Sequence, residues 1–115
     1  MKTNEDVLNI VYKINTNLEY EISSEGIVTI LEAQNHWIQR AFRKIGFRIP
    51  KYKKTDLDVL GSFIFQQIDG INTVEKIGEL VDERFGEESH PLYERLLLFL
   101  NYIDVQCGYI ETQDV

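Results

Sequence analysis

The spacing of the apolar residues changes near residue 57, and this change restricts the chain to folds that join strands to helices. Ahead of it lie two short segments rich in β-forming residues, 18–22 and 27–31. They are joined by Ser23-Ser24-Glu25-Gly26, in which the glycine can supply a positive φ. A β-hairpin is therefore predicted over 18–31.

Between the hairpin and residue 57 the sequence predicts a short helix and then a third strand. Apolar residues recur at helical spacing between Asn35, a candidate N-cap, and Gly46, a candidate helix stop. Pro50 then prevents a helix, and 52–57 alternates as a strand does, with lysines that an exposed edge tolerates. The first fifteen residues fit either a short helix or a leading strand, and their spacing does not decide between the two.

Two helices are predicted directly after the third strand. Asp58 is a suitable N-cap for the first, and Asp69-Gly70 ends it with residues typical of a turn. The second is capped by Asn72 or Thr73 and ends at Gly86. Their buried faces are expected to consist of Leu60, Phe63, Ile64 and Ile68 in the first helix and Val74, Ile77, Leu80, Val81 and Phe85 in the second.

A third helix is predicted with Pro91 in its first turn, where the missing N–H does no harm. It ends at Gly108, and residues 109–111 can add a brief strand or wing. Its core residues are expected to be Leu92, Leu96, Phe99, Leu100 and Ile103.

Strands followed by a run of helices indicate an α+β fold. We expect a small N-terminal antiparallel β-sheet of about three strands packed on a winged-helix-like unit of three helices. The length of 115 residues suits a single domain. Its β-rich part would span 18–57, with a basic helical insertion at about 34–51, and its helical part with a short wing would span 58–111.

The charged residues are strongly segregated along the chain. Residues 1–32 carry two basic and six acidic side chains, 33–55 carry seven basic and no acidic ones, and the rest carries three basic and thirteen acidic ones. The basic stretch indicates either an electrostatic docking surface or a solvated loop beside an edge strand guarded by lysines. The sequence leaves both interpretations open.

Several functional classes are disfavoured by what the sequence lacks. The longest apolar run is Leu96 to Leu100, which is too short for a signal peptide or a membrane span, so a cytoplasmic protein is expected. The single cysteine, Cys107, excludes an internal disulfide. His36, His90 and Cys107 do not have the spacing of metal ligands, and no nucleophile motif is present. We therefore expect no enzyme, no metal and no cofactor.

An ordered set of motifs resembles the PqqD family. It consists of Leu57-Asp58-x-x-Gly61-x-x-Ile64, then Asp69-Gly70-x-x-Thr73-Val74-x-x-Ile77, and then Gly108-Tyr109-Ile110 after a third helix. The resemblance covers 52–111 well and the hairpin loosely, whereas the insertion after the hairpin is longer than the link usual in that family. Members of the family are non-catalytic recognition elements, which bind the leader of a ribosomally made precursor peptide and serve a tailoring enzyme, often a radical S-adenosylmethionine enzyme.

The resemblance also implies a binding mode. In the family, the leader peptide lies as an extra strand beside the third strand, and its apolar side chains enter a groove bounded by the third helix. On this sequence the strand edge is Tyr52, Lys53, Lys54, Thr55 and Asp56, and the groove wall is Arg95, Leu98, Phe99 and Tyr102. A plainer interpretation stays open for the wall, in which Phe99 is core, Leu98 and Tyr102 are merely exposed, and Arg95 pairs with a nearby glutamate.

Two other functions share parts of this outline. A winged-helix DNA-binding regulator also has three helices and a wing, but it needs a basic recognition helix. Here Arg95 is the only basic residue of the third helix, against Glu94 and Asp104, although the basic run at 40–54 keeps a role with nucleic acid open. A structural subunit that bridges two other proteins would have no affinity for short extended peptides.

Overall fold

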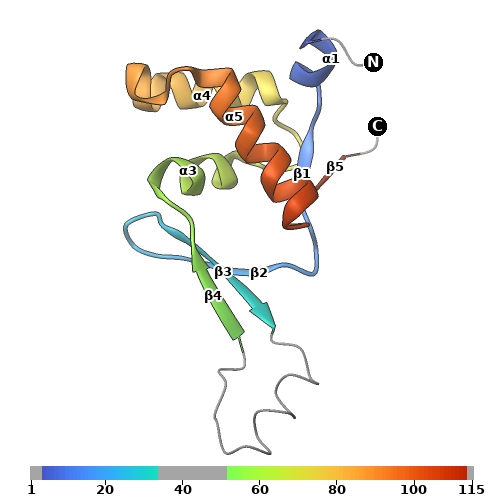
Figure 1. The fold of residues 1–115 in the computed structure, drawn as a ribbon, viewed down its shortest axis with the longest axis vertical. Helices are drawn as coiled ribbons and strands as arrows, with labels where there is room; N and C mark the ends of the chain where they lie inside the picture. Colours follow the sequence, from blue (N-terminus) through green and yellow to red (C-terminus); the bar gives the residue numbers. More distant parts are fainter. Residues whose placement is uncertain (1–3, 34–51, 114–115) are drawn as a thin grey trace, which may run out of the picture.

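The computed structural model describes residues 4–33 and 52–113 and has the α+β fold that the sequence predicts. A three-stranded sheet lies beneath a layer of helices, and the two ends of the chain lie together at one side (Figure 1). The predicted helix at 35–46 falls outside the described residues. The elements in chain order are α1 (Asn4–Leu8), β1 (Tyr12–Ile14), β2 (Glu19–Ile22), β3 (Val28–Ala33), β4 (Tyr52–Asp56), α3 (Val59–Gln67), α4 (Val74–Phe85), the 3₁₀ turn η1 (Gly86–Ser89), α5 (Leu92–Asn101), the π-helical turn η2 (Tyr102–Gln106) and β5 (Ile110–Thr112).

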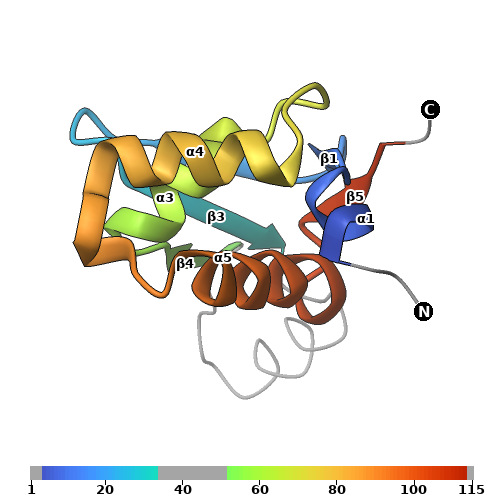
Figure 2. The same cartoon turned by 90° about the horizontal axis from the view of Figure 1, so that it is seen from above.

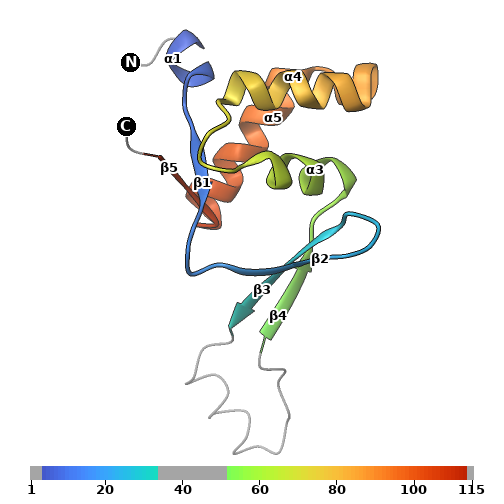
Figure 3. The same ribbon diagram turned by 180° about the vertical axis from the view of Figure 1, so that it is seen from behind.

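The three-stranded sheet is antiparallel, in the order β2-β3-β4. Its first two strands form the predicted hairpin, in which Gly26 adopts the expected positive φ of 83° and the Ser23 N–H donates to the Ile27 carbonyl at 2.9 Å. The third strand is confirmed as β4. From above, β4 lies on the side of the sheet that α5 covers (Figure 2), and from behind, β2 lies on the near side (Figure 3).

A second, two-stranded sheet joins the two ends of the chain. β1 pairs antiparallel with β5, so that Tyr12 lies opposite Thr112 and Ile14 opposite Ile110. The N-terminal segment therefore contains both of the structures that its sequence allowed, the short helix α1 and then a strand. The brief strand expected after Gly108 is confirmed, and its partner is the N-terminal strand.

The helix boundaries follow from the local capping chemistry that the sequence predicts. The Asp58 carboxylate accepts a hydrogen bond from the Gly61 N–H at 2.7 Å, and the Thr73 hydroxyl accepts one from the Lys76 N–H at 3.1 Å, so Thr73 is the cap of α4. The Asp69 carboxylate accepts from the N–H groups of the next turn, and these bonds lower its pKa. One prediction is wrong by a residue: Pro91 is the N-cap of α5 and lies just before its first turn.

The core lies between the helices and one face of β3. Val28 and Ile30 of that strand are fully buried against apolar residues of the three long helices. Eight of the fourteen expected core residues are buried, and Phe65 is buried although it was not expected. The other six are only half-buried: Leu60, Phe63, Leu80, Phe85, Leu92 and Phe99. The buried Ser62 hydroxyl accepts from the Val28 N–H at 2.9 Å and donates to the Leu57 carbonyl at 3.3 Å, so α3 is tied to β3 and to the residue that follows β4.

Candidate peptide-binding edge

The backbone of β4 pairs with β3 along one edge only, among the residues described here. The Leu57 N–H donates to the Val28 carbonyl at 2.9 Å, which fixes the phase of the antiparallel ladder. Since the bonding direction alternates along a strand, the N–H and C=O groups of Lys53 and Thr55 point toward β3. Those of Tyr52, Lys54 and Asp56 point away from it and form an open strand edge.

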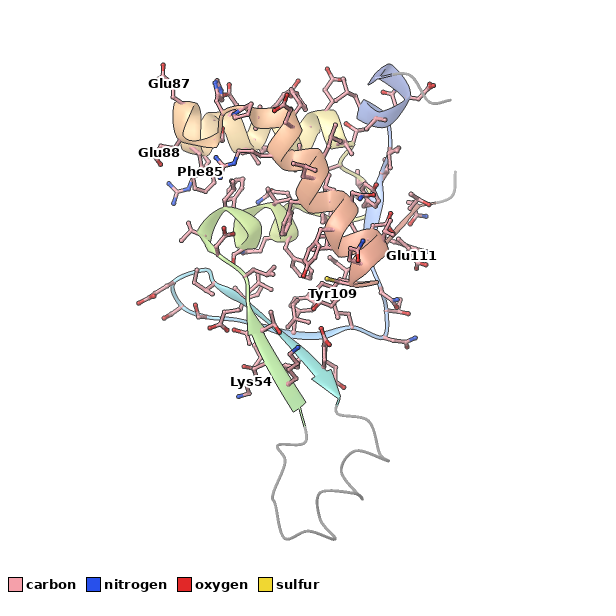
Figure 4. The ribbon with its side chains drawn as sticks, viewed as in Figure 1. Lys54, Phe85, Glu87, Glu88, Tyr109 and Glu111 are labelled. Atoms are coloured by element: carbon pink, nitrogen blue, oxygen red, sulfur yellow. The ribbon has the colours of Figure 1, made fainter. Side chains whose placement is uncertain are left out.

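The side chains of β4 divide between the two faces of the sheet. Lys53 and Thr55 lie on the face that carries the helices, since Thr55 is the cross-strand partner of the buried Ile30. Lys54 and Asp56 lie on the opposite face, and Figure 4 shows Lys54 low on β4, away from the helices. The Asp56 carboxylate accepts a hydrogen bond from the Thr29 hydroxyl at 2.6 Å. This bond involves only the side chain of Asp56, so it does not engage the backbone groups that Asp56 directs to the open edge.

An apolar stripe runs along the exposed side of α5 and η2. Leu98, Tyr102 and Val105 are 71%, 57% and 66% exposed. Leu98 and Tyr102 are four residues apart and lie on the same side of the helix, and Val105 lies in the π-helical turn that continues it. Leu96, Leu100 and Ile103 occupy the buried side. The predicted wall residues Leu98 and Tyr102 are thus solvent-accessible, and Val105 extends them by one turn.

Tyr102 interacts with Cys107, which lines a hollow together with Leu31 and Glu32 of β3. The pKa of Tyr102 is raised, first by a hydrogen bond with the Cys107 thiol, and the negative charge of Glu32 on β3 contributes further. Glu32 is the cross-strand partner of Lys53 on β4. The apolar stripe therefore ends beside the part of the sheet that leads to the open edge.

Phe99 joins α5 to the start of α3. It is half-buried, and a Cβ atom at Gly61 would lie only 3.1 Å from its ring. Gly61 is the glycine of the first resemblance motif, and this close approach explains why a side chain would not fit there. Phe99 is thus a packing residue between α5 and the first turn of α3.

Arg95 is engaged at the other end of α5. Its guanidinium donates to the backbone carbonyl of Glu88 in η1 at 2.6 Å, in place of the glutamate carboxylate that the plainer interpretation suggested. Figure 4 shows Glu88 at the far end of the helical layer from Tyr109. Arg95 lies three residues before Leu98, on the same side of α5, but its guanidinium is engaged by the Glu88 carbonyl at the start of the helix.

A contact between Tyr109 and Glu32 fixes the sheet against the end of α5. The buried Tyr109 hydroxyl donates to the Glu32 carboxylate, and the two residues lie 77 positions apart in the sequence. Burial raises the pKa of Tyr109, and the hydrogen bond to Glu32 raises it further. Sequence reasoning missed this pair because no local pattern links residues so far apart.

Other chemistry is sparse in the part of the chain that the structure describes. No group of three His, Cys, Asp or Glu side chains there could hold a metal ion. His90 contacts Asp82 at 3.0 Å on the surface. No described helix has the length and apolar character needed to cross a bilayer.

Comparison of the chain with family models, curated proteins and solved structures finds no match.

Proposed function

We propose that this chain is a non-catalytic, cytoplasmic peptide-binding adaptor that captures the leader of a ribosomal precursor peptide and presents it to a modifying enzyme. One observation carries the proposal: no strand in the described residues 4–33 and 52–113 pairs with the outer edge of β4, which lies on the side of the sheet covered by α5 and its exposed apolar stripe. Strand addition needs both features, because backbone pairing supplies affinity and apolar contacts select the side chains of the ligand.

The open edge has room for a short β-ladder. Tyr52, Lys54 and Asp56 each direct one N–H and one C=O outward, so a leader of about five residues would pair in register with them. Apolar leader side chains on the helical face would cover Leu98, Tyr102 and Val105. Full burial of each leucine or valine side chain contributes about 1.5–3 kcal/mol, which offsets part of the free energy needed to order a disordered leader.

The charges near this edge favour an acidic leader. Lys53 and Lys54 are exposed on opposite faces of β4 and can meet carboxylates on either side of an added strand. The modifying enzyme would supply the catalytic groups and any cofactor. A radical S-adenosylmethionine enzyme is the partner that the resemblance to the PqqD family suggests.

A winged-helix DNA-binding function fits the described surface less well. Its recognition helix would be α5, where Arg95 already donates to Glu88 and the exposed stripe is apolar. Duplex binding would appear as an affinity that falls steeply with salt, whereas leader binding by strand addition depends on salt far less.

The test is a pair of substitutions at one position of β4. Lys54→Pro removes the outward N–H, while Lys54→Ala removes the same side chain and keeps the N–H. The probes are synthetic peptides from the short reading frames that neighbour this one, titrated by calorimetry. We expect Lys54→Pro to weaken binding about tenfold or more relative to Lys54→Ala, since a buried hydrogen bond is lost from the ladder.

A second proline distinguishes the open edge from the paired one. Thr55→Pro removes an N–H that points toward β3, so it should lower the stability of the sheet itself. Equal leader affinity in Lys54→Pro and Lys54→Ala, with both variants folded by circular dichroism, would show that the leader does not pair with β4.

A further inference from the structure

The opposite edge of the same sheet is also open. The Ser23 N–H donates to the Ile27 carbonyl, so Glu21 and Glu19, two and four residues earlier, also direct their backbone groups toward β3. The N–H and C=O groups of Tyr20 and Ile22 consequently point outward. No strand in the described parts of the chain pairs with β2 on that side.

An apolar hollow adjoins this second edge. It has a volume of ≈ 180 Å³ and is lined by Ile14, Tyr20, Ile22, Phe65, Gln66 and Ile68. Tyr20 is 40% and Ile22 49% exposed, and the Tyr20 ring packs edge-on against Phe65 with centroids 5.0 Å apart. The β2 edge therefore combines free backbone groups with apolar side chains on the helical face of the sheet.

The other face of β2 is acidic. Glu19 and Glu21 are exposed there, opposite Leu31 and Thr29, and neither carboxylate forms an ion pair with a described residue. The charge at this edge is thus opposite to that at β4, where Lys53 and Lys54 are exposed. The two edges of one sheet differ in the ligands that their charges select.

We propose that β2 is a second docking edge, which receives an extended segment of a partner protein in which apolar residues alternate with lysine or arginine. Residues opposite Tyr20 and Ile22 would enter the apolar hollow, because cross-strand partners share a face of the sheet. Residues opposite Glu19 and Glu21 would meet the two carboxylates. This pattern stands apart from the leader peptide proposed at β4 and does not depend on it.

A second copy of this chain fits the edge poorly. If two β2 strands paired antiparallel with their outward groups facing, either well-overlapped register would set Glu19 or Glu21 of one copy against Glu21 of the other, and like charges in that position are destabilising. In an antiparallel pairing, the β4 strand of another copy would set Lys54 opposite Tyr20 or Ile22 and place its charged side chain over the apolar hollow. The occupant is therefore a different protein.

The test uses blocked hexapeptides, (Val-Lys)₃ and (Val-Glu)₃, added to the ¹⁵N-labelled full chain. We expect (Val-Lys)₃ to shift the amide signals of residues 19–22 and to bind at least about fivefold more tightly than (Val-Glu)₃. The double variant Glu19→Lys and Glu21→Lys alters only exposed side chains and should reverse this preference. Lys54→Pro should leave (Val-Lys)₃ binding unchanged, which separates this edge from β4.

Three results would overturn the inference. The first is the absence of shifts at residues 19–22 with (Val-Lys)₃, and the second is a preference that the double glutamate variant leaves unchanged. The third is a concentration-dependent dimer in sedimentation that the double variant alters, which would assign the edge to a second copy of this chain.

Discussion

Gly61 shows how a single residue links the fold to the candidate site. It lies in the first turn of α3, where an added Cβ would come within 2.8 Å of the Asp58 carboxylate and 3.1 Å of the Phe99 ring. The same residue therefore permits the N-cap of α3 and the close packing of α5 against the first turn of α3, which follows β4 in the chain. The resemblance motif identified the glycine from sequence, but only the structure gives its physical reason.

Gly61→Ala should destabilise the protein by about 1–3 kcal/mol in urea unfolding, because the added methyl group overpacks the contact with Phe99. The sign of this change in the free energy of unfolding tests the packing, since a glycine-to-alanine exchange in an open helix stabilises a protein by roughly 0.5–1 kcal/mol. The double variant Gly61→Ala with Phe99→Leu should recover part of the loss. A more stable Gly61→Ala variant would contradict the close packing described here.

Tyr109 gives a residue-level prediction for alkaline pH. Burial and the contact with Glu32 raise its pKa above the ordinary value of 10.0, so the folded state favours the neutral phenol. The resulting stabilisation is present below pH 10 and is lost as the pH rises toward the raised pKa. Tyr109→Phe should be less stable than the natural chain by about 1 kcal/mol at pH 8, and this difference should shrink above pH 10. A difference that stays constant between pH 8 and pH 11 would show that the hydroxyl has no such role.

At the scale of elements, the sequence predicted those parts of the structure that depend on local chemistry. The hairpin turn at Gly26 and the caps at Asp58 and Thr73 each need only a few neighbouring residues. The pairing of β1 with β5 could not be predicted, because it joins opposite ends of the chain. The same limit applies to the contact between Tyr109 and Glu32.

The sequence could name candidate residues for the site, but it could not say which of their side chains are exposed or where their backbone groups point. The resemblance supplied Leu98 and Tyr102, but whether an apolar helical residue is buried or exposed depends on tertiary packing, so Val105 was missed. Which residues of β4 direct their backbone groups outward was also open in the sequence. The register with β3 decides it in favour of Tyr52, Lys54 and Asp56.

Tyr102→Ala tests the stripe on α5 as an element. Tyr102 is 57% exposed, so its truncation should change the free energy of unfolding by less than about 0.5 kcal/mol. Leader affinity should fall about tenfold, because an aromatic contact is lost from the interface. The control is Asn101→Ala, which alters an exposed neighbour that points about 100° away around the helix. Equal losses of affinity in the two variants would remove the stripe from the site.

At the scale of the whole molecule, the main feature is a small sheet beneath one layer of helices, whose two edges differ in charge and have no further partner strand in the described part of the chain. This difference in charge between the two edges follows from the segregation of charge along the sequence, since β2 belongs to the acidic first part of the chain and β4 to the basic stretch. Exposed strand edges invite aggregation unless they are short or charged, and both of these edges are short and charged. The arrangement suits a protein that holds two different chains at once.

The most direct measurement is amide hydrogen exchange along β4, read by NMR with and without the leader peptide. In the free protein, the amides of Lys53 and Thr55 should be protected, and those of Lys54 and Asp56 should exchange quickly. Saturation with leader should protect Lys54 and Asp56 and leave Lys53 and Thr55 little changed. A bound leader that gives no added protection at Lys54 and Asp56 would contradict strand addition at this edge.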